Sequence, residues 1–286
     1  MGFLYGLAVA LIWGAQPVVA SFGYRAGLTA FDLTLLRFGA SGLVMLPLVL
    51  RRGLGNACGI GWRRAIVLIL LAGPLYNMVL VGGLTWAPAT HSSLIYPAFT
   101  PLFTAILART MLSGNDRLPL LGLGLLLVGV VSIKLGAVLH PTGAEHPDAW
   151  RGDLLFMGAA LMWSFYTVLM RRWNTDPLAV VAMVQVGGLL YVPAYLLVQG
   201  TQMFQLDLSA ITIQALYQGI LVSVISVLMF NLAVRMLGAK ASMFTALMPI
   251  VGVSLAVVFL GEPLTSTLVA GTLCIVGGLF LALARK

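Results

Sequence analysis

The chain has 286 residues, of which 60% are apolar and only 8% are Asp, Glu, Lys or Arg, against roughly a quarter charged in an ordinary soluble domain. So few charges cannot cover a water-soluble surface, which excludes a soluble globular enzyme or binding protein. The formal net charge of +8 could suggest an acidic partner such as nucleic acid, but basic residues of a membrane protein more often report its topology.

Stretches of about 20 apolar residues recur along the whole chain, and each is long enough to cross a ~30 Å hydrocarbon core as a helix. We predict ten transmembrane helices, at roughly 3–22, 32–50, 65–84, 91–111, 118–138, 152–170, 177–198, 211–233, 241–260 and 264–284. The first apolar run has neither preceding basic residues nor a following A-x-A-like cleavage site, so we expect it to persist rather than to be removed as a signal peptide.

The basic residues are distributed unequally between the two ends of these helices. If both termini lie on one side, that side carries Arg51, Arg52, Arg63, Arg64, Arg109, Arg117, Arg171, Arg172, Arg235, Lys240, Arg285 and Lys286, and the opposite side carries Arg25, Arg37, Lys134 and Arg151. The positive-inside rule therefore places both termini in the cytoplasm. We expect an integral protein of the plasma (bacterial inner) membrane, and the basic charge needs no nucleic-acid partner.

Weak internal similarity relates the two halves of the chain. LIWGAQPVV near residue 11 matches LMWSFYTVL near residue 161, and PLFTAILARTML from Pro101 matches PIVGVSLAVVFL from Pro249. The repeat is about 148–150 residues, or five helices, so the two copies cross the membrane in opposite directions. We predict a first repeat at 1–138, an outer connecting loop at 139–150 and an inverted second repeat at 151–286, which is an architecture typical of transporters.

Two five-helix repeats, a Trp in the middle of each repeat's first helix and the closing run PIVGVSLAVVFLGEPLTSTLVAGTLCIVGGLFLA resemble the drug/metabolite transporter superfamily, EamA branch, over nearly the whole chain. The aromatic residues are most similar to those of the YddG-type aromatic amino-acid exporters. The resemblance implies an all-α integral membrane fold of ten helices, in which helices 1, 3, 4, 6, 8 and 9 form a central cavity. The family's Gly-Glu turn is present as Gly261-Glu262, but the first repeat has Ser113-Gly114-Asn115-Asp116 in its place, so we interpret the turn as a helix connection rather than as a catalytic or ion-coupling site.

Two tryptophans lie at unusual depth. Trp13 and Trp163 are ten to twelve residues into their predicted spans, whereas Trp in membrane helices usually gathers at the interfaces. They either fill the core of the bundle or contact lipid, or they face each other across a central binding site. Gln16 one turn after Trp13, and Tyr166 one turn after Trp163, favour the binding site.

Polar residues and prolines in other spans extend this predicted site. An amide such as Asn77 is costly against lipid, so it should point into the bundle, where it either packs or binds. A proline within a helix leaves the carbonyl four residues earlier without its donor, and such carbonyls are tolerated at membrane depth only where another group satisfies them. The predicted substrate-binding residues are Trp13, Gln16, Tyr76, Asn77, His91, Tyr96, Thr100, Trp163, Tyr166, Phe244 and Met248, and the predicted hinge or kink prolines are Pro17, Pro74, Pro97, Pro101 and Pro249. Tyr217, Gln218, Ser223 and Ser226 rank lower, because hydroxyls more often hydrogen-bond to their own helix.

The charged residues bear on the class of solute. Asp32, Asp153, Asp176 and Glu262 all lie near predicted helix ends, whereas a proton antiporter for cations is expected to keep a carboxylate within the membrane. Arg37 lies inside a span, where it either extends to the outer surface, which we favour, or binds a carboxylate. We therefore predict a transporter that exports small zwitterionic or neutral metabolites, above all amino acids including aromatic ones, by alternating access without strong proton coupling.

Other interpretations stay open. Gly39-Ala40-Ser41-Gly42 matches the G-x-S-G of intramembrane serine proteases, but a nucleophilic serine needs a histidine in reach, and close helix packing explains the small residues better. A receptor or scaffold without transport is a third class. The glycines of helices 5 and 10 should serve close packing, either within one chain or across a dimer. Neither Cys58 nor Cys274 is accompanied by other potential metal ligands. We expect no metal and no cofactor.

Overall fold

The computed structural model describes residues 1–112, 119–139 and 147–283. Within these ranges every regular element is helical, and nine helical segments are long and apolar enough to cross a membrane. The one remaining predicted span, at 118–138, corresponds to α6 (Leu120–Leu139), which contains a shorter apolar stretch. The predicted all-α membrane fold with two repeat-like halves is therefore confirmed. Residues 113–116 and most of the predicted connecting loop at 139–150 lie outside the described residues.

The remaining helices follow one another with short connections. In chain order they are α1 (Gly2–Arg25), α2 (Ala30–Arg52), α3 (Trp62–Ala72), α4 (Pro74–Gly82), α5 (Ala89–Met111), α7 (Ala149–Trp173), α8 (Pro177–Gly187), α9 (Tyr191–Gln199), α10 (Leu208–Gln214), α11 (Ser226–Leu237), α12 (Met248–Leu255) and α13 (Ser266–Leu283). Some spans combine several elements. The pairs α3 and α4, and α8 and α9, each form one span, and the π-helical segment η5 (Ala215–Ile225) joins α10 to α11 in another.

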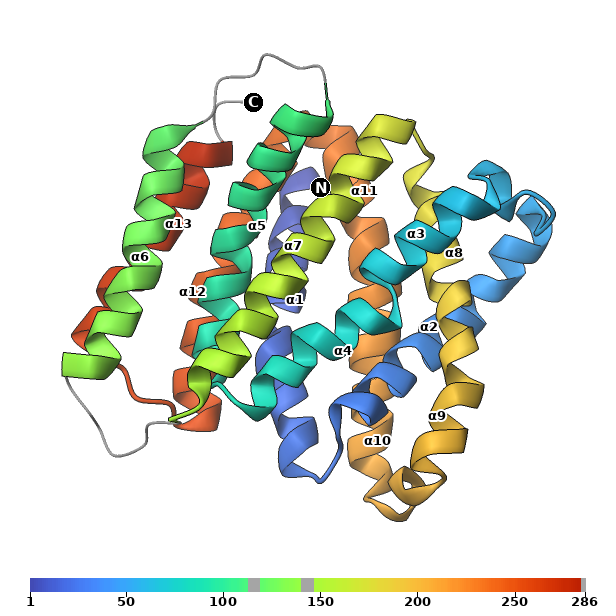
Figure 1. The fold of residues 1–286 in the computed structure, drawn as a ribbon, viewed down its shortest axis with the longest axis horizontal. Helices are drawn as coiled ribbons and strands as arrows, with labels where there is room; N and C mark the ends of the chain where they lie inside the picture. Colours follow the sequence, from blue (N-terminus) through green and yellow to red (C-terminus); the bar gives the residue numbers. More distant parts are fainter. Residues whose placement is uncertain (113–118, 140–146, 284–286) are drawn as a thin grey trace.

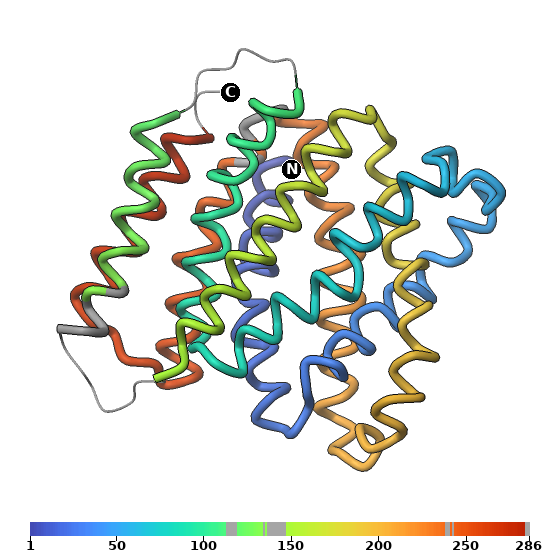
Figure 2. Tube along the Cα trace, viewed as in Figure 1, coloured from blue at the N-terminus to red at the C-terminus, as the bar shows by residue number. Residues whose placement is uncertain are grey.

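The helix α1 begins and the helix α13 finishes at the same end of the bundle (Figure 1). We call this the termini end, and we call the opposite end, where α1 finishes and α5 begins, the far end. The pair α6 and α13 lies side by side along one edge of the molecule (Figure 2).

Packing partners are exchanged between the halves. The first helix of the chain, α1, packs against α11 and α12 of the second half, and α7, the first helix of the second half, packs against α4 and α5 of the first. The helices α2 and α8 also contact each other across the halves, as do α6 and α13. Each half therefore completes the core of the other.

Glycines allow α6 and α13 to approach closely within one chain. A Cβ atom added to Gly271 would lie 2.9 Å from the Gly129 carbonyl oxygen, and one added to Gly278 would lie 2.8 Å from that of Gly122. These distances are too short for any other residue. The predicted glycine packing between helices 5 and 10 is therefore intramolecular.

The prolines occupy two kinds of position. Pro74 begins α4 directly after Gly73, which interrupts the span, and Pro249 lies in the first turn of α12. A missing N–H costs nothing in a first turn, because no intrahelical acceptor faces it. Pro17, Pro97 and Pro101 instead lie inside continuous helices. A role for any of them as a hinge stays a prediction.

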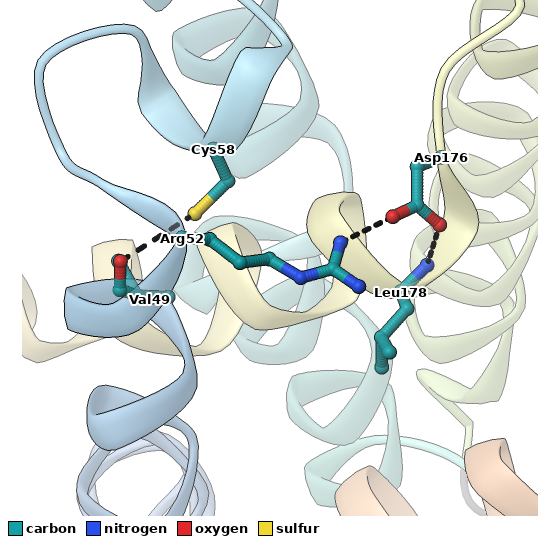
Figure 3. A network of polar contacts seen from close by, with 5 residues as sticks. All are labelled: Val49, Arg52, Cys58, Asp176 and Leu178. Carbon is teal, nitrogen blue, oxygen red and sulfur yellow. Dashed lines mark hydrogen bonds and ion pairs between the residues drawn. The ribbon is translucent and has the colours of Figure 1, made fainter.

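A polar network joins the two halves at the termini end (Figure 3). The Arg52 guanidinium at the end of α2 donates to Asp176, which accepts from the Leu178 N–H as the N-cap of α8. Burial alone would raise the pKa of Asp176, but the hydrogen bonds from Arg52 and Leu178, with the Arg52 charge, lower it below its ordinary value. The Cys58 thiol lies 3.8 Å from the Val49 carbonyl oxygen, and burial raises the pKa of that thiol, although Arg52 acts in the opposite direction.

Candidate substrate site inside the bundle

A cluster of polar and aromatic side chains lies inside the bundle, where the helices of both halves meet. Its members come from α2, α4, α5, α7 and η5, and we call it the tyrosine–arginine cluster. The cluster consists of Thr34, Arg37, Tyr76, Asn77, Tyr96, Trp163, Tyr166 and Ser223. Five of these were predicted as substrate-binding residues.

Arg37 is the central charge of this cluster. Its Nε donates to the Ser223 hydroxyl at 3.0 Å and its Nη1 donates to the Asn77 amide oxygen at 2.8 Å. The Asn77 amide nitrogen in turn donates to Thr34 Oγ1 at 2.9 Å. Since these partners belong to α4 and η5, which both pack against α2, the guanidinium points into the bundle. The favoured expectation that Arg37 extends toward the outer surface was wrong, because interior hydrogen-bond acceptors hold the side chain.

Aromatic rings line the cluster next to this charge. The hydroxyls of Tyr76 and Tyr96 lie 2.8 Å apart, and the ring centroids of Tyr76 and Trp163 are 5.5 Å apart. Trp163 also contacts Tyr166, with centroids at 5.0 Å. Tyr76 and Tyr166 are buried, whereas Tyr96 and Trp163 keep part of their surface accessible. The cluster therefore combines aromatic faces with an amide and a cation.

A second cluster lies between α1 and the span that contains η5. Trp13 Nε1 donates to the Ser226 hydroxyl at 2.7 Å, and the Trp13 ring lies 5.3 Å from the Phe230 ring. One turn further along α1, the Gln16 amide donates to Gln218 at 3.4 Å. We call these residues, with Gln214, the glutamine cluster. Ser226 also bonds to its own helix, as predicted for hydroxyls of this span, but it accepts from Trp13 as well.

The two clusters are related by the internal repeat. Trp163 lies 150 residues after Trp13, and Ser226 lies 150 residues after Tyr76. In each half, the tryptophan of the first helix thus contacts the same position of the third helix in the other half. Ser226 is thus the repeat equivalent of the predicted site residue Tyr76. This equivalence is a signal in the sequence that would have placed Ser226 higher among the candidate site residues. That the two indoles face each other across one space stays a prediction.

Other predicted site residues lie outside both clusters. Thr100 donates to the Tyr96 carbonyl of its own helix, and Phe244 packs edge-on against Phe3 in the first turn of α1. Met248 begins α12, and its carbonyl oxygen faces Gly14 of α1. The structure therefore places these three outside the tyrosine–arginine cluster.

The far end holds further contacts between the halves. His91 Nδ1 of α5 lies 2.8 Å from Asp153 Oδ1 of α7. The Glu262 carboxylate, in the turn before α13, accepts from the backbone N–H groups of Ala89 and Thr90 at 2.7 and 2.9 Å. The predicted site residue His91 is therefore part of a contact between the halves.

The small residues around Ser41 serve helix packing. A Cβ atom on Gly42 would lie 2.6 Å from the Leu189 side chain, and the Ser41 hydroxyl donates to Gln185 Oε1 at 2.8 Å. His91 is engaged with Asp153 at the far end. This geometry supports the packing interpretation of the Gly-Ala-Ser-Gly run over the protease.

Comparisons with known proteins agree with this architecture. A model of the EamA-like transporter family matches residues 1–135 and 150–284. The "Uncharacterized transporter YetK" of Bacillus subtilis (strain 168) is 25% identical over 220 residues, which make up 74% of this chain and 65% of YetK. The "Uncharacterized protein PA1977" of Pseudomonas aeruginosa is 30% identical over 263 residues, covering 90% of this chain and 85% of the relative. One crystal structure, 22% identical in sequence, aligns with 98% of this chain and 96% of its own at a TM-score of 0.64, a likeness of fold alone.

The membrane-spanning helices and the two repeat-like halves with shared interior clusters describe a polytopic membrane protein, in an arrangement typical of transporters. Since the family model covers nearly the whole chain, the protein belongs to the EamA-like transporter family. The predicted drug/metabolite transporter superfamily is thus confirmed. The family and the transporter-named relative point to a transporter rather than to an enzyme.

Proposed function

We propose that this protein exports small zwitterionic or neutral metabolites, above all amino acids including aromatic ones, across the plasma (bacterial inner) membrane. The observation that carries the proposal is the stack of Tyr76, Trp163 and Tyr166 next to Asn77, built by helices of both halves. Aromatic faces bind an apolar or aromatic side chain, and the neighbouring amide supplies hydrogen bonds that orient a small solute.

Alternating access is the mechanism that we propose. In inverted-repeat transporters the substrate site lies near the bilayer midplane, and one half rocks against the other around it. Because the halves exchange packing partners, helices of both halves line the tyrosine–arginine cluster. Relative motion of the halves would therefore expose the cluster to one side of the membrane and then to the other. A central cavity among helices 1, 3, 4, 6, 8 and 9, and cytoplasmic termini, are parts of this proposal.

Facilitated or weakly coupled transport fits the placement of the carboxylates. Asp32 caps the start of α2, Asp176 caps α8 and Glu262 contacts the start of α5. Proton-coupled pumps keep ionisable carboxylates on the substrate path within the membrane. We therefore expect the flux to follow the solute gradient.

The test is transport by the purified protein in liposomes. We expect saturable uptake of labelled phenylalanine and threonine that does not respond to an imposed pH gradient, and no uptake of a cationic dye. Trp163→Ala should lower phenylalanine flux about tenfold or more, because the loss of one aromatic contact and its buried area is worth roughly 1.5 kcal/mol or more.

The matched control is Trp150→Ala, which removes an exposed indole from the far end of the same helix, α7. It should leave the flux unchanged. Dye uptake that depends on the pH gradient would contradict the mechanism, and saturable binding without flux of any solute would favour a receptor.

A further inference from the structure

Arg37 carries a positive charge at membrane depth with neutral hydrogen-bond partners. It lies seven residues into α2, about 10 Å along the helix from Ala30. Among the described residues, every carboxylate is engaged elsewhere: Asp32 with Thr29 and Tyr195, Asp148 with Arg151, Asp153 with His91, Asp176 with Arg52, Asp207 with Ser209 and Glu262 with the start of α5. The guanidinium therefore has acceptors but no counter-charge in the part of the chain that the structure describes.

The two neutral acceptors satisfy only part of what a guanidinium within a membrane span requires. The group has five N–H donors, and the bonds to Ser223 and Asn77 engage Nε and Nη1. A charge within a membrane span is costly, and such residues usually face a partner or a substrate pathway. A solute that brings a negative charge would supply both the missing acceptors and the missing counter-charge.

The surroundings of Arg37 suit an organic acid with an apolar or aromatic body. The guanidinium donates to Asn77, the residue next to Tyr76 in the chain, the Tyr76 hydroxyl lies 2.8 Å from that of Tyr96, and the Trp163 ring stacks on Tyr76 with centroids 5.5 Å apart. Arg37 itself keeps part of its surface accessible. Its partner Ser223 belongs to the π-helical segment η5, and π-helical turns are frequent at functional sites.

We infer that Arg37 binds the carboxylate of the transported solute, while Tyr76 and Trp163 contact its apolar body. Arg–carboxylate pairs are often bidentate and are among the strongest hydrogen-bonded contacts in proteins. One guanidinium matches a monocarboxylate, because a phosphate dianion would leave an uncompensated negative charge in the membrane. This inference deepens the proposed function and rests on it, because the bound solute is a transported one only if the protein is a transporter. Solutes without a carboxylate should then bind poorly, which removes neutral metabolites from the proposed class, keeps the zwitterions and adds organic acids.

Binding can be tested without any transport assay. The purified protein in detergent is titrated with 3-phenylpropionate and with its neutral amide, 3-phenylpropanamide, which differ only at the carboxyl group. A ligand that binds the folded state raises the thermal midpoint. We expect wild type to prefer the acid over the amide about tenfold or more, and Arg37→Gln to lose the preference.

Two further variants sharpen the test. Arg109→Gln removes an exposed arginine from the last turn of α5 and should keep the preference, while Arg37→Lys keeps the charge without the planar fork and should retain only part of it. If Arg37→Gln fails to fold, the acid and the amide on wild type still decide. Equal binding of the two ligands by wild type, or an unchanged preference in a folded Arg37→Gln protein, would overturn the inference.

The two proposals fail in different ways. Phenylalanine flux without a preference for the acid would leave the transporter proposal standing and remove the role of Arg37. A clear preference for the acid without amino-acid flux would support carboxylate binding by Arg37 and contradict the proposal of an amino-acid exporter.

Discussion

At the scale of single residues, the contacts of Glu262 explain the role of the Gly261-Glu262 turn. Gly261 has a φ of +73°, a left-handed conformation that favours glycine. It turns the chain so that the Glu262 carboxylate accepts from the N–H groups of Ala89 and Thr90. These N–H groups have no acceptor within α5, and the positive end of the helix dipole lies there. The turn is thus a cap that one half provides for a helix of the other.

Replacing this cap should lower stability. We expect Glu262→Ala to reduce the free energy of unfolding by about 1–2 kcal/mol, as for other lost helix caps. Glu262→Gln should cost less, because the amide oxygen still accepts a hydrogen bond. The thermal midpoint in detergent measures both changes. Equal midpoints for wild type and Glu262→Ala would show that the cap contributes nothing to stability.

At the scale of elements, the contact between α6 and α13 depends on backbone approaching backbone. Gly122 and Gly129 of α6 face Gly278 and Gly271 of α13. In a membrane, helix association gains from such close packing rather than from the hydrophobic effect, since lipid is as apolar as the side chains. Gly124, on another face of α6, has no atom within 4 Å of an added Cβ.

A pair of alanine substitutions separates packing from helix propensity. Gly271→Ala should destabilise the protein by about 1–3 kcal/mol, because the added methyl group overpacks against the Gly129 carbonyl and Ile133. Gly124→Ala adds the same group where there is room, so it should be neutral or stabilise by up to about 1 kcal/mol. Thermal midpoints in detergent compare the two variants. A Gly271→Ala protein as stable as Gly124→Ala would contradict the close contact.

At the scale of the whole molecule, the charge distribution and the fold together predict an orientation. The helix α1 begins and α13 finishes at the same end of the bundle (Figure 1), and the predicted spans put twelve of the sixteen basic residues on that side. A fluorescent reporter fused after residue 286 should therefore be active in the cytoplasm. A periplasmic phosphatase inserted after Gly27, at the far end, should be active outside. The reverse pattern of activities would overturn the orientation.

Much of the fold could be predicted from hydropathy and the internal repeat. Apolar length identifies membrane spans because each must cross the same thickness of hydrocarbon, and the glycines of helices 5 and 10 indicate a close contact. The partner of that contact could not be predicted, because packing within one chain and packing between two chains need the same residues. For the candidate site, depth in the span selects Tyr76, Asn77 and Trp163. Arg37 was misjudged because its distance from the helix end permits snorkelling, and only the tertiary contacts with Asn77 and Ser223 decide its direction.

The bond from Arg37 to Ser223 also has a consequence for biosynthesis. The two residues are 186 positions apart, so at typical synthesis rates a ribosome reaches Ser223 roughly 10–40 s after Arg37. During that time Arg37 in the nascent first half lacks one of its native hydrogen-bond acceptors. The helix α1 likewise lacks its packing partners α11 and α12 until they have been synthesised. Completion of the core therefore depends on the rate of translation, and a chain released before η5 is made would present its unfinished interior to the cell's quality-control proteases.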